Sequence, residues 1–120
     1  MKIKNRLSIG VDIVSIERIR NILTSSKRDR FLSRIFSSKE IKDALSKSDE
    51  AQFFAGRFAA KEAFKKASST NNLISSNTFK SIEIYNHKSG KPSVKVKNSQ
   101  NIDLSISHER NYAIAFCITS

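Results

Sequence analysis

The segment FAGRFAAKEAFKKA, residues 54–67, constrains the fold of this chain more than any other stretch of its sequence. It lies in a helix predicted from about Asp49 to Ser68, with acids in its first turn and lysines in its last, an order that suits the helix dipole. At about 100° per residue, small side chains gather on one side of this helix. They are Ala59, Ala60, Ala63 and Ala67. We therefore expect the helix to lie close against a sheet.

The N-terminal part of the chain predicts one strand followed by short helices. The stretch RLSIGVDIVSI alternates apolar with polar residues, which is typical of a strand with one face buried, and its apolar positions include Ile9, Val11 and Ile13. Ser15 can cap the helix IERIRNILTSS that follows. RDRFLSRIF predicts a second helix. SSKEIKDALSK predicts a third, which has the spacing of a capping box and is expected to bury Leu45.

The C-terminal part of the chain predicts strands paired in two hairpins. FKSIEIYN and PSVKV flank a turn at HKSGK, and NIDLSIS and YAIAFCIT flank HERN. With the preceding strand and helices, this order predicts an α+β domain whose mostly antiparallel sheet packs on the long helix. A length of 120 residues suits one such domain, spanning 1–120, and is too short for two ordinary cores.

The net charge of +11 predicts an anionic partner. Nucleic acid, an acidic protein and a phosphorylated small molecule all satisfy this requirement, and a lysine-rich surface without a binding role is the alternative. No apolar run is long enough to span a membrane, and the N-terminal residues lack the features of a secretion signal. The single Cys117 cannot form an internal disulfide, which fits a reducing compartment. We expect a cytoplasmic protein without a membrane partner.

Glu62 is the one acid among the cations of the long helix, and two interpretations of it are open. Glu62 and Lys66 have the spacing of a surface ion pair, so the helix can simply carry a solvated charged face. A functional interpretation needs a second acid, and Asp12 on the polar face of the first strand is the candidate. Two carboxylates near lysines suit Mg²⁺, which prefers oxygen ligands and takes others from substrate phosphates.

A third segment, LSISHERNYAIAF, places hydroxyls and a histidine at the end of a predicted strand. Ser107 and His108 are therefore candidates for phosphate contacts, and the imidazole is also a candidate proton acceptor. A histidine at a hairpin turn can equally be a solvated surface residue.

Three segments resemble, in this order and spacing, the signature segments of holo-acyl-carrier-protein synthases, the small single-domain branch of the 4′-phosphopantetheinyl transferases. They are IGVDIVSIERI, RFAAKEAFKKA and LSISHERNYAIAF, and FLSRIFSSKEI and GKP are also similar to that branch. The resemblance runs from about Ile9 to Ile118. It implies the fold of that family and a homotrimer with active sites at subunit interfaces. The implied reaction, part of fatty acid biosynthesis, transfers phosphopantetheine from coenzyme A to a serine of apo acyl carrier protein and releases adenosine 3′,5′-bisphosphate.

The resemblance also assigns roles to individual residues. It implies that Asp12 and Glu62 hold Mg²⁺, with Mn²⁺ as an alternative, and that Lys66 contacts the phosphates with help from Lys61. The implied catalytic set is Asp12, Glu62, Lys66 and His108. The implied coenzyme A contacts are Lys61, Lys66, Gly90, Lys91, Pro92, Ser107 and His108, with the Gly-Lys-Pro loop at the adenosine 3′-phosphate end.

The proton acceptor and the docking surface are less closely defined. A water on the metal, Glu109 or His108 can accept the proton of the serine hydroxyl, and the sequence does not choose among them. Because carrier proteins of this kind are acidic, the resemblance implies that they dock on basic early helices. The residues concerned are Arg18, Arg30, Phe31 and Arg34.

Three other functions are compatible with the composition alone. A nucleic-acid-binding module fits the charge, but no helix-turn-helix, zinc or RNA-recognition signature is visible, and we expect no nucleic-acid partner. A Mg²⁺-dependent phosphodiesterase or nuclease would use the same acids. A purely structural basic protein leaves Asp12 unexplained.

Overall fold

The computed structural model describes residues 7–68, 78–97 and 101–120. It confirms the predicted α+β fold and the order of its elements. These are β1 (Ser8–Ser15), α1 (Ile16–Leu23), α2 (Arg28–Ile35), α3 (Ser38–Ala44), α4 (Glu50–Ser68), the 3₁₀ helix η2 (Phe79–Ser81), β2 (Glu83–Asn86), β3 (Pro92–Lys95), β4 (Ile102–His108) and β5 (Tyr112–Thr119).

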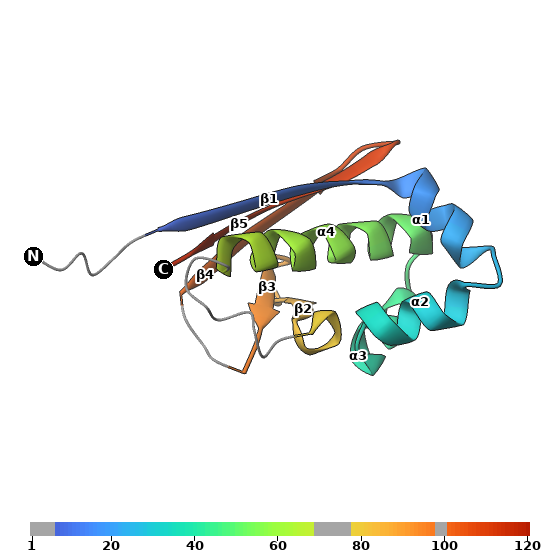
Figure 1. Ribbon diagram of the computed structural model, residues 1–120, viewed down its shortest axis with the longest axis horizontal. Coiled ribbons are helices and arrows are strands. Elements are labelled where there is room, and N and C mark those ends of the chain that lie inside the picture. Colours follow the sequence, from blue (N-terminus) through green and yellow to red (C-terminus); the bar gives the residue numbers. More distant parts are fainter. Residues whose placement is uncertain (1–6, 69–77, 98–100) are drawn as a thin grey trace, which may run out of the picture.

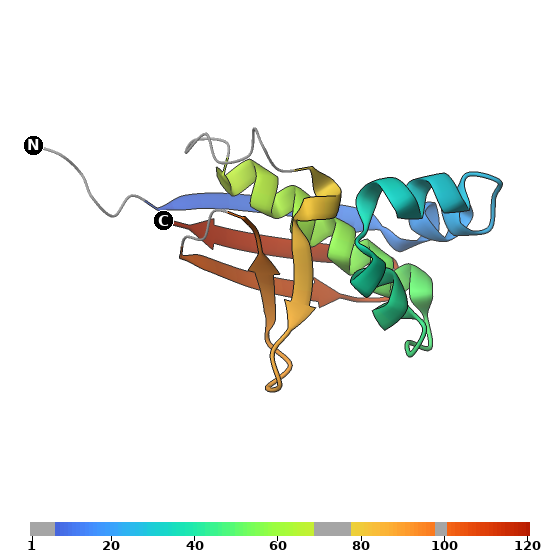
Figure 2. The same cartoon turned by 90° about the horizontal axis from the view of Figure 1, so that it is seen from below.

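The strands form two antiparallel sheets that share the long helix as a neighbour. One sheet has the order β1-β5-β4, and the β2–β3 hairpin forms the other. Helix α4 lies along one face of the three-stranded sheet, and α1 to α3 gather beyond one end of it (Figure 1). Seen from below, the β2–β3 hairpin crosses the long strands steeply (Figure 2). The described residues include no helix long and apolar enough to cross a membrane.

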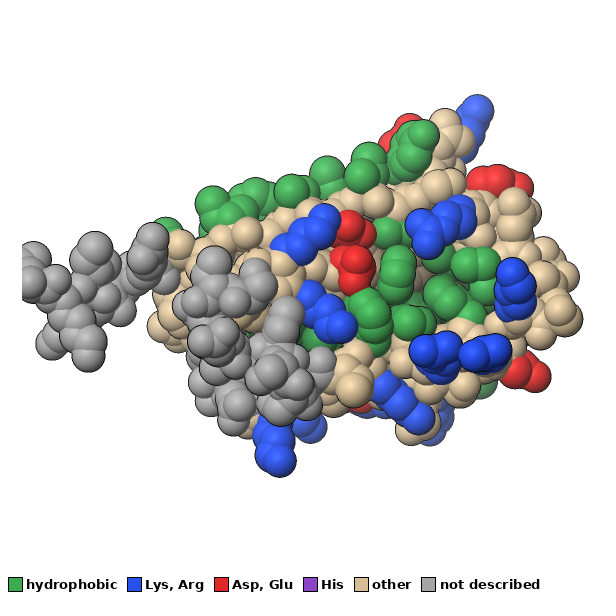
Figure 3. Space-filling model, viewed as in Figure 1, with side chains coloured by type: hydrophobic (Ala, Val, Ile, Leu, Met, Phe, Trp, Pro, Cys, Tyr) green, Lys and Arg blue, Asp and Glu red, His purple; other side chains and the backbone are tan. Residues whose placement is uncertain are grey.

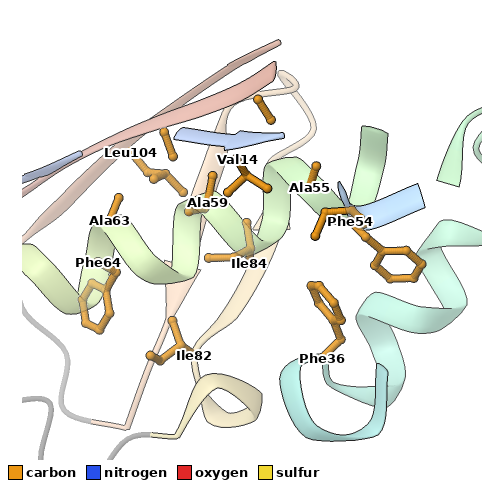
Figure 4. Packing of buried hydrophobic residues seen from close by; sticks show 14 of the residues in the cluster. Val14, Phe36, Phe54, Ala55, Ala59, Ala63, Phe64, Ile82, Ile84 and Leu104 are labelled. Atoms are coloured by element: carbon orange, nitrogen blue, oxygen red, sulfur yellow. The ribbon is translucent and has the colours of Figure 1, made fainter. Parts of the chain in front are cut away.

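The alanine side of α4 packs against the sheet as predicted. Ala59, Ala60 and Ala63 are fully buried, and Figure 4 shows Ala55, Ala59 and Ala63 pointing from α4 toward the strands. The helix approaches β1 so closely at Gly10 that a Cβ built there would lie 1.9 Å from the Ala63 carbonyl oxygen. Small side chains on both elements therefore set the distance between helix and sheet.

The buried face of β1 is the opposite of the one that the alternating pattern predicts. Gly10 and Val14 face α4 and are buried, whereas Ile9 and Ile13 are about 60% exposed. The expected burial of the apolar face is therefore wrong within one chain. The helix covers the other face of β1 instead, because Gly10 on that face allows α4 to approach closely. We use the name exposed apolar face for Leu7, which precedes β1, for Ile9, Val11 and Ile13 on β1, and for Tyr112, Ile114 and Phe116 on β5.

The rest of the core joins α4 to the short helices and the hairpin. The centroids of the Phe36 and Phe54 rings lie 4.7 Å apart. In Figure 4, the Phe64 side chain leaves α4 on the side where Ile82 lies. Ser15 caps α1, and Ser37 with Glu40 forms the predicted capping box of α3. The predicted burial of Leu45 is wrong, since this residue follows the last turn of α3 and is 84% exposed.

Candidate active site

Asp12 and Lys66 come together where β1 runs beside α4. The Lys66 ammonium lies 3.1 Å from Asp12 Oδ1 and donates a hydrogen bond to the Val11 carbonyl oxygen at 3.0 Å. Glu62 lies one turn before Lys66, on the same side of the helix. The structure therefore pairs Lys66 with Asp12 of β1, and we use the name acidic half-site for Asp12 and Lys66 together with Glu62.

The donor set of the acidic half-site fits Mg²⁺. On the face shown in Figure 3, acidic side chains gather over α4 between lysine or arginine side chains. Among the residues that the structure describes, no group of three metal-binding side chains lies together. A metal at Asp12 and Glu62 would therefore depend on waters and substrate oxygens, and Mg²⁺ commonly binds to one or two protein carboxylates in this way.

Lys61 does not belong to this half-site, although it directly precedes Glu62. Its side chain is fully buried, and its ammonium donates to Glu40 Oε1 at 2.7 Å, to Phe79 O at 2.7 Å and to Ile35 O at 2.9 Å. An ammonium has three hydrogen-bond donors, and all of them are used here. The expectation that Lys61 contacts coenzyme A is therefore wrong.

A second cluster lies on the opposite side of α4. Here a pocket of about 340 Å³ is lined by Phe53, Gly56 and Arg57 of the helix together with His108 and the turn between β2 and β3. Phe53 precedes Glu62 by nine residues, about two and a half helical turns, so the two side chains leave the helix in opposite directions. We call this cluster the arginine half-site.

Arg57 is the unusual residue of the arginine half-site. It is only 8% exposed, its guanidinium carbon lies 4.6 Å from the centre of the Phe53 ring, and its buried Nε has no hydrogen-bond partner in the described structure. Burial lowers the pKa of Arg57 below its ordinary value, although the carboxylates of Glu40 and Asp43 oppose the shift. A buried cation is costly unless it is paired, so this position favours an anion in the pocket.

The loop at residues 90–92 contributes to the same pocket. Gly90 and Pro92 line it, and Gly90 adopts a φ of 92°, a left-handed conformation that favours glycine. Lys91 turns away instead, and its ammonium lies 3.7 Å from Asp103 in an exposed pair. The structure thus brings two of the three predicted loop residues to Arg57.

Ser107 and His108 are not brought together. Successive residues of a strand point to opposite faces, so His108 lines the pocket beside α4 while Ser107, opposite Ile114, lies on the exposed apolar face. His108 also lies on β4, two strands or roughly 10 Å from β1, and α4 packs against both of these strands. One chain therefore does not assemble His108 with the other predicted catalytic residues.

Three of the four predicted docking residues line one groove. Arg30, Phe31 and Arg34 of α2 face Phe79 and Lys65 across a groove of about 900 Å³. Arg18 is exposed on α1, one turn before Ile22, which also lines the groove. Figure 3 shows the apolar side chains of this region bordered by basic ones, next to the acidic patch over α4.

Sequence reasoning missed Arg57 and Phe53. Arg57 opens the motif RFAAKEA, so the signal was present, but a helical arginine with an adjacent run of lysines is hard to distinguish from a surface residue. Its burial arises from tertiary packing beside α4, to which the β2–β3 hairpin contributes Asn86, Gly90 and Pro92.

Comparison with known proteins confirms the resemblance given by the motifs. The family model described as the 4′-phosphopantetheinyl transferase superfamily matches residues 8–117, and the chain belongs to this superfamily. The holo-[acyl-carrier-protein] synthase of Thermodesulfovibrio yellowstonii is 40% identical over 111 residues, which cover 92% of this chain and 95% of that protein.

Solved structures agree with this assignment. A holo-(acyl-carrier-protein) synthase from Bacillus anthracis in complex with CoA (3′,5′-ADP) matches with a TM-score of 0.79 and 36% identity, covering 93% of this chain and 94% of that one. The ACPS–CoA complex of Chronobacterium ammoniagenes has a TM-score of 0.82 and 28% identity, and the match covers 96% and 97% of the two chains. The fold is therefore the 4′-phosphopantetheinyl transferase fold.

Proposed function

We infer that this chain transfers 4′-phosphopantetheine from coenzyme A to a serine of apo acyl carrier protein, the reaction of a holo-[acyl-carrier-protein] synthase. The relative named above carries that name, and both of the similar structures described are complexes with CoA. The observation that carries the proposal is the Asp12–Lys66 pair with Glu62 one turn away, in a chain of this superfamily. The substrate supplies what this cluster lacks, a diphosphate.

The reaction is an in-line phosphoryl transfer. The serine oxygen forms a bond to the phosphorus that carries pantetheine, and the bond from that phosphorus to the leaving adenosine 3′,5′-bisphosphate breaks. Lys66 would offset charge on the diphosphate, and positioning supplies much of the rate. The serine proton must pass to an acceptor. Within one chain, His108 lines the pocket on the opposite side of α4 from Glu62, so it would reach the serine only from a neighbouring copy. Glu109, in the turn that follows β4, is the other candidate acceptor.

We propose that Asp12 and Glu62 hold Mg²⁺, with Mn²⁺ as an alternative. When bound, the metal would offset negative charge on the diphosphate. The residues of this chain orient it: Asp12 is 16% exposed in its side chain and is fixed by β1, and Glu62 is fixed by α4.

The arginine half-site is proposed to hold the adenosine 3′-phosphate end of coenzyme A. Arg57, whose Nε has no partner among the described residues, supplies the charge, and Gly90 and Pro92 supply the turn against which the nucleotide would lie. Ser107 remains proposed as a coenzyme contact, and Lys91 would have to leave Asp103, which costs little for an exposed pair.

We propose a homotrimer, as the resemblance implies. One chain carries the two half-sites on opposite sides of α4, so one coenzyme molecule would use them together only if a neighbouring copy contributes one of them. The exposed apolar face offers a surface for this contact, because contiguous apolar patches of this kind mark interfaces.

The groove between α2 and η2 is proposed to receive an acidic carrier protein. Arg30 and Arg34 supply positive charge at the rim, and Phe31 supplies an apolar contact within it. The proposed protein is a single domain of the cytoplasm, where its one cysteine, Cys117, is free and buried.

One assay tests the function directly. The protein is incubated with Mg²⁺, coenzyme A and apo acyl carrier protein, and the carrier is weighed by mass spectrometry. We expect a gain equal to one phosphopantetheine group, which disappears when the acceptor serine is replaced by alanine or when Mg²⁺ is chelated. A carrier of unchanged mass under the complete conditions would overturn the proposed function.

A further inference from the structure

Lys61 and Glu40 form a fully buried ion pair that the proposed chemistry does not use. Their side chains are both 0% exposed, and Lys61 Nζ lies 2.7 Å from Glu40 Oε1. The same carboxylate accepts hydrogen bonds from Ser37 N at 2.9 Å and from Ile84 N at 2.8 Å. The pair therefore links α4 to the start of α3 and to β2.

The other two hydrogen bonds of Lys61 go to the walls of the groove between α2 and η2. One acceptor is the carbonyl oxygen of Ile35, the last residue of α2, which has no partner within its own helix. The other is the carbonyl oxygen of Phe79, the first residue of η2. Ile35 and Phe79 both line the groove, so one ammonium holds a backbone atom of each wall.

The same side of α4 also holds the ring of Phe79. The Phe58 ring lies 5.7 Å from it between centroids, and the Lys65 ammonium lies 3.7 Å from its centre. Phe58, Lys61 and Lys65 have the i, i+3 and i+7 spacing of neighbours along one helix face. Lys61 is the only one of these three side chains that also contacts α2 by a hydrogen bond in the described structure.

This arrangement separates Lys61 from the coenzyme. The ammonium is buried away from solvent, so it is not placed to touch either substrate, and it contacts both α2 and η2. On α2, Phe31 and Arg34 lie within one turn of Ile35, and both line the same groove. A change in the position of Ile35 would therefore move the groove residues directly.

We propose that Lys61 is a positioning residue for the protein substrate: by holding Ile35 and Phe79, it fixes the width of the groove and with it the recognition of an acidic carrier protein. This inference rests on the proposed function. It replaces the direct coenzyme contact that the sequence predicted for Lys61 with an indirect role toward the other substrate.

The test separates groove shape from general stability. Lys61→Met removes the ammonium and leaves Glu40 as an uncompensated buried charge, so the variant should also lose thermal stability. The double variant Lys61→Met/Glu40→Gln leaves no uncompensated buried charge, and its amide oxygen can still accept one of the two backbone hydrogen bonds that Glu40 accepts. It does not restore the hydrogen bonds to Ile35 and Phe79. Lys39→Met, which removes a lysine that is 61% exposed, is the matched control.

Initial rates are measured with carrier protein varied at saturating coenzyme A, and then with coenzyme A varied at saturating carrier protein. In both Lys61 variants we expect the KM for the carrier protein to rise about tenfold, a common cost of misplaced substrate-positioning groups, while the KM for coenzyme A changes less than about twofold. Lys39→Met should keep both wild-type values. If Lys61→Met does not fold, the double variant alone decides.

Two results would overturn the inference. In the first, both KM values rise together, which indicates a general loss of structure. In the second, the double variant recovers the wild-type KM for the carrier protein, which indicates that only stability depended on the pair. A wild-type protein that transfers no phosphopantetheine would instead refute the proposed function itself.

Discussion

The two half-sites on α4 differ in how their charges are satisfied. In the acidic half-site, Asp12 already pairs with Lys66, and both groups reach solvent. In the arginine half-site, Arg57 is buried beside Phe53, and its Nε has no partner in the described structure. The acidic half-site suits a place where one cation replaces another beside a diphosphate. The arginine half-site suits a phosphate that is held in one position. The difference teaches that one helix can present, on opposite sides, two unlike clusters that suit the two ends of the proposed ligand.

The largest expected effect follows from removing an acid of the acidic half-site. Asp12→Ala and Glu62→Ala should each lower kcat by about a thousandfold, because metal binding and the resulting charge stabilisation are lost. Phosphopantetheine transfer is measured by mass spectrometry, and circular dichroism checks that the fold is intact. Glu17→Ala, at an exposed acid of α1, is the control and should retain the wild-type rate. Near-normal rates in both site variants would refute the two-carboxylate metal site.

A smaller effect of a different kind is expected on the other side of the helix. Arg57→Ala should raise the KM for coenzyme A by about thirtyfold, the cost of losing a buried charge that pairs with a phosphate. The variant should bind coenzyme A and 3′-dephospho-coenzyme A equally well, whereas the wild type should prefer coenzyme A. A variant that still prefers coenzyme A would show that Arg57 does not recognise the 3′-phosphate.

Mixing the two variants tests whether the half-sites belong to neighbouring copies. When Glu62→Ala and Arg57→Ala chains are denatured and refolded together, about a quarter of random interfaces combine an intact acidic half-site with an intact arginine half-site. At low coenzyme A we therefore expect about a quarter of the wild-type rate, roughly tenfold above the sum of the two variants alone. A rate equal to that sum would place both half-sites of each active site in one chain.

The smallest expected effects are those on docking. Arg34→Glu should raise the KM for the carrier protein about fivefold, and Arg18→Glu somewhat less, because Arg34 lines the groove and Arg18 lies beside it. Both effects should weaken at high salt, and the KM for coenzyme A should not follow them. Equal changes in the two KM values would argue against the docking assignment.

The sequence was sufficient to predict those structural features whose cause lies within a short segment of the chain. The caps at Ser15 and Ser37, the alanine side of α4 and the two hairpins all follow from spacing and turn chemistry, and each is present in the structure. The motifs also indicated the acidic half-site, since Asp12 lies beside α4 on the Glu62–Lys66 side.

The remaining features depend on which elements pack together. Lys61 and Lys66 are alike in sequence, but Lys61 faces the buried capping carboxylate of Glu40 and Lys66 faces the edge strand β1. Burial of Arg57 depends on the β2–β3 hairpin in the same way. The alternation in β1 predicts that its two faces differ, but it does not predict that the Gly10 and Val14 face is the one that α4 covers.

The absence of a side chain at Gly10 affects the position of the acidic half-site. The atoms that a Cβ at this position would strike are Ala63 O and Ala67 N, at 1.9 and 2.7 Å, and these residues directly follow Glu62 and Lys66 in the chain. Asp12 is two residues along the same strand. Because glycine has no side chain, the backbones of β1 and α4 can lie in direct contact at this position. Any side chain there would push the helix outward and widen the gap between Asp12 and Glu62, the two carboxylates proposed to hold the metal.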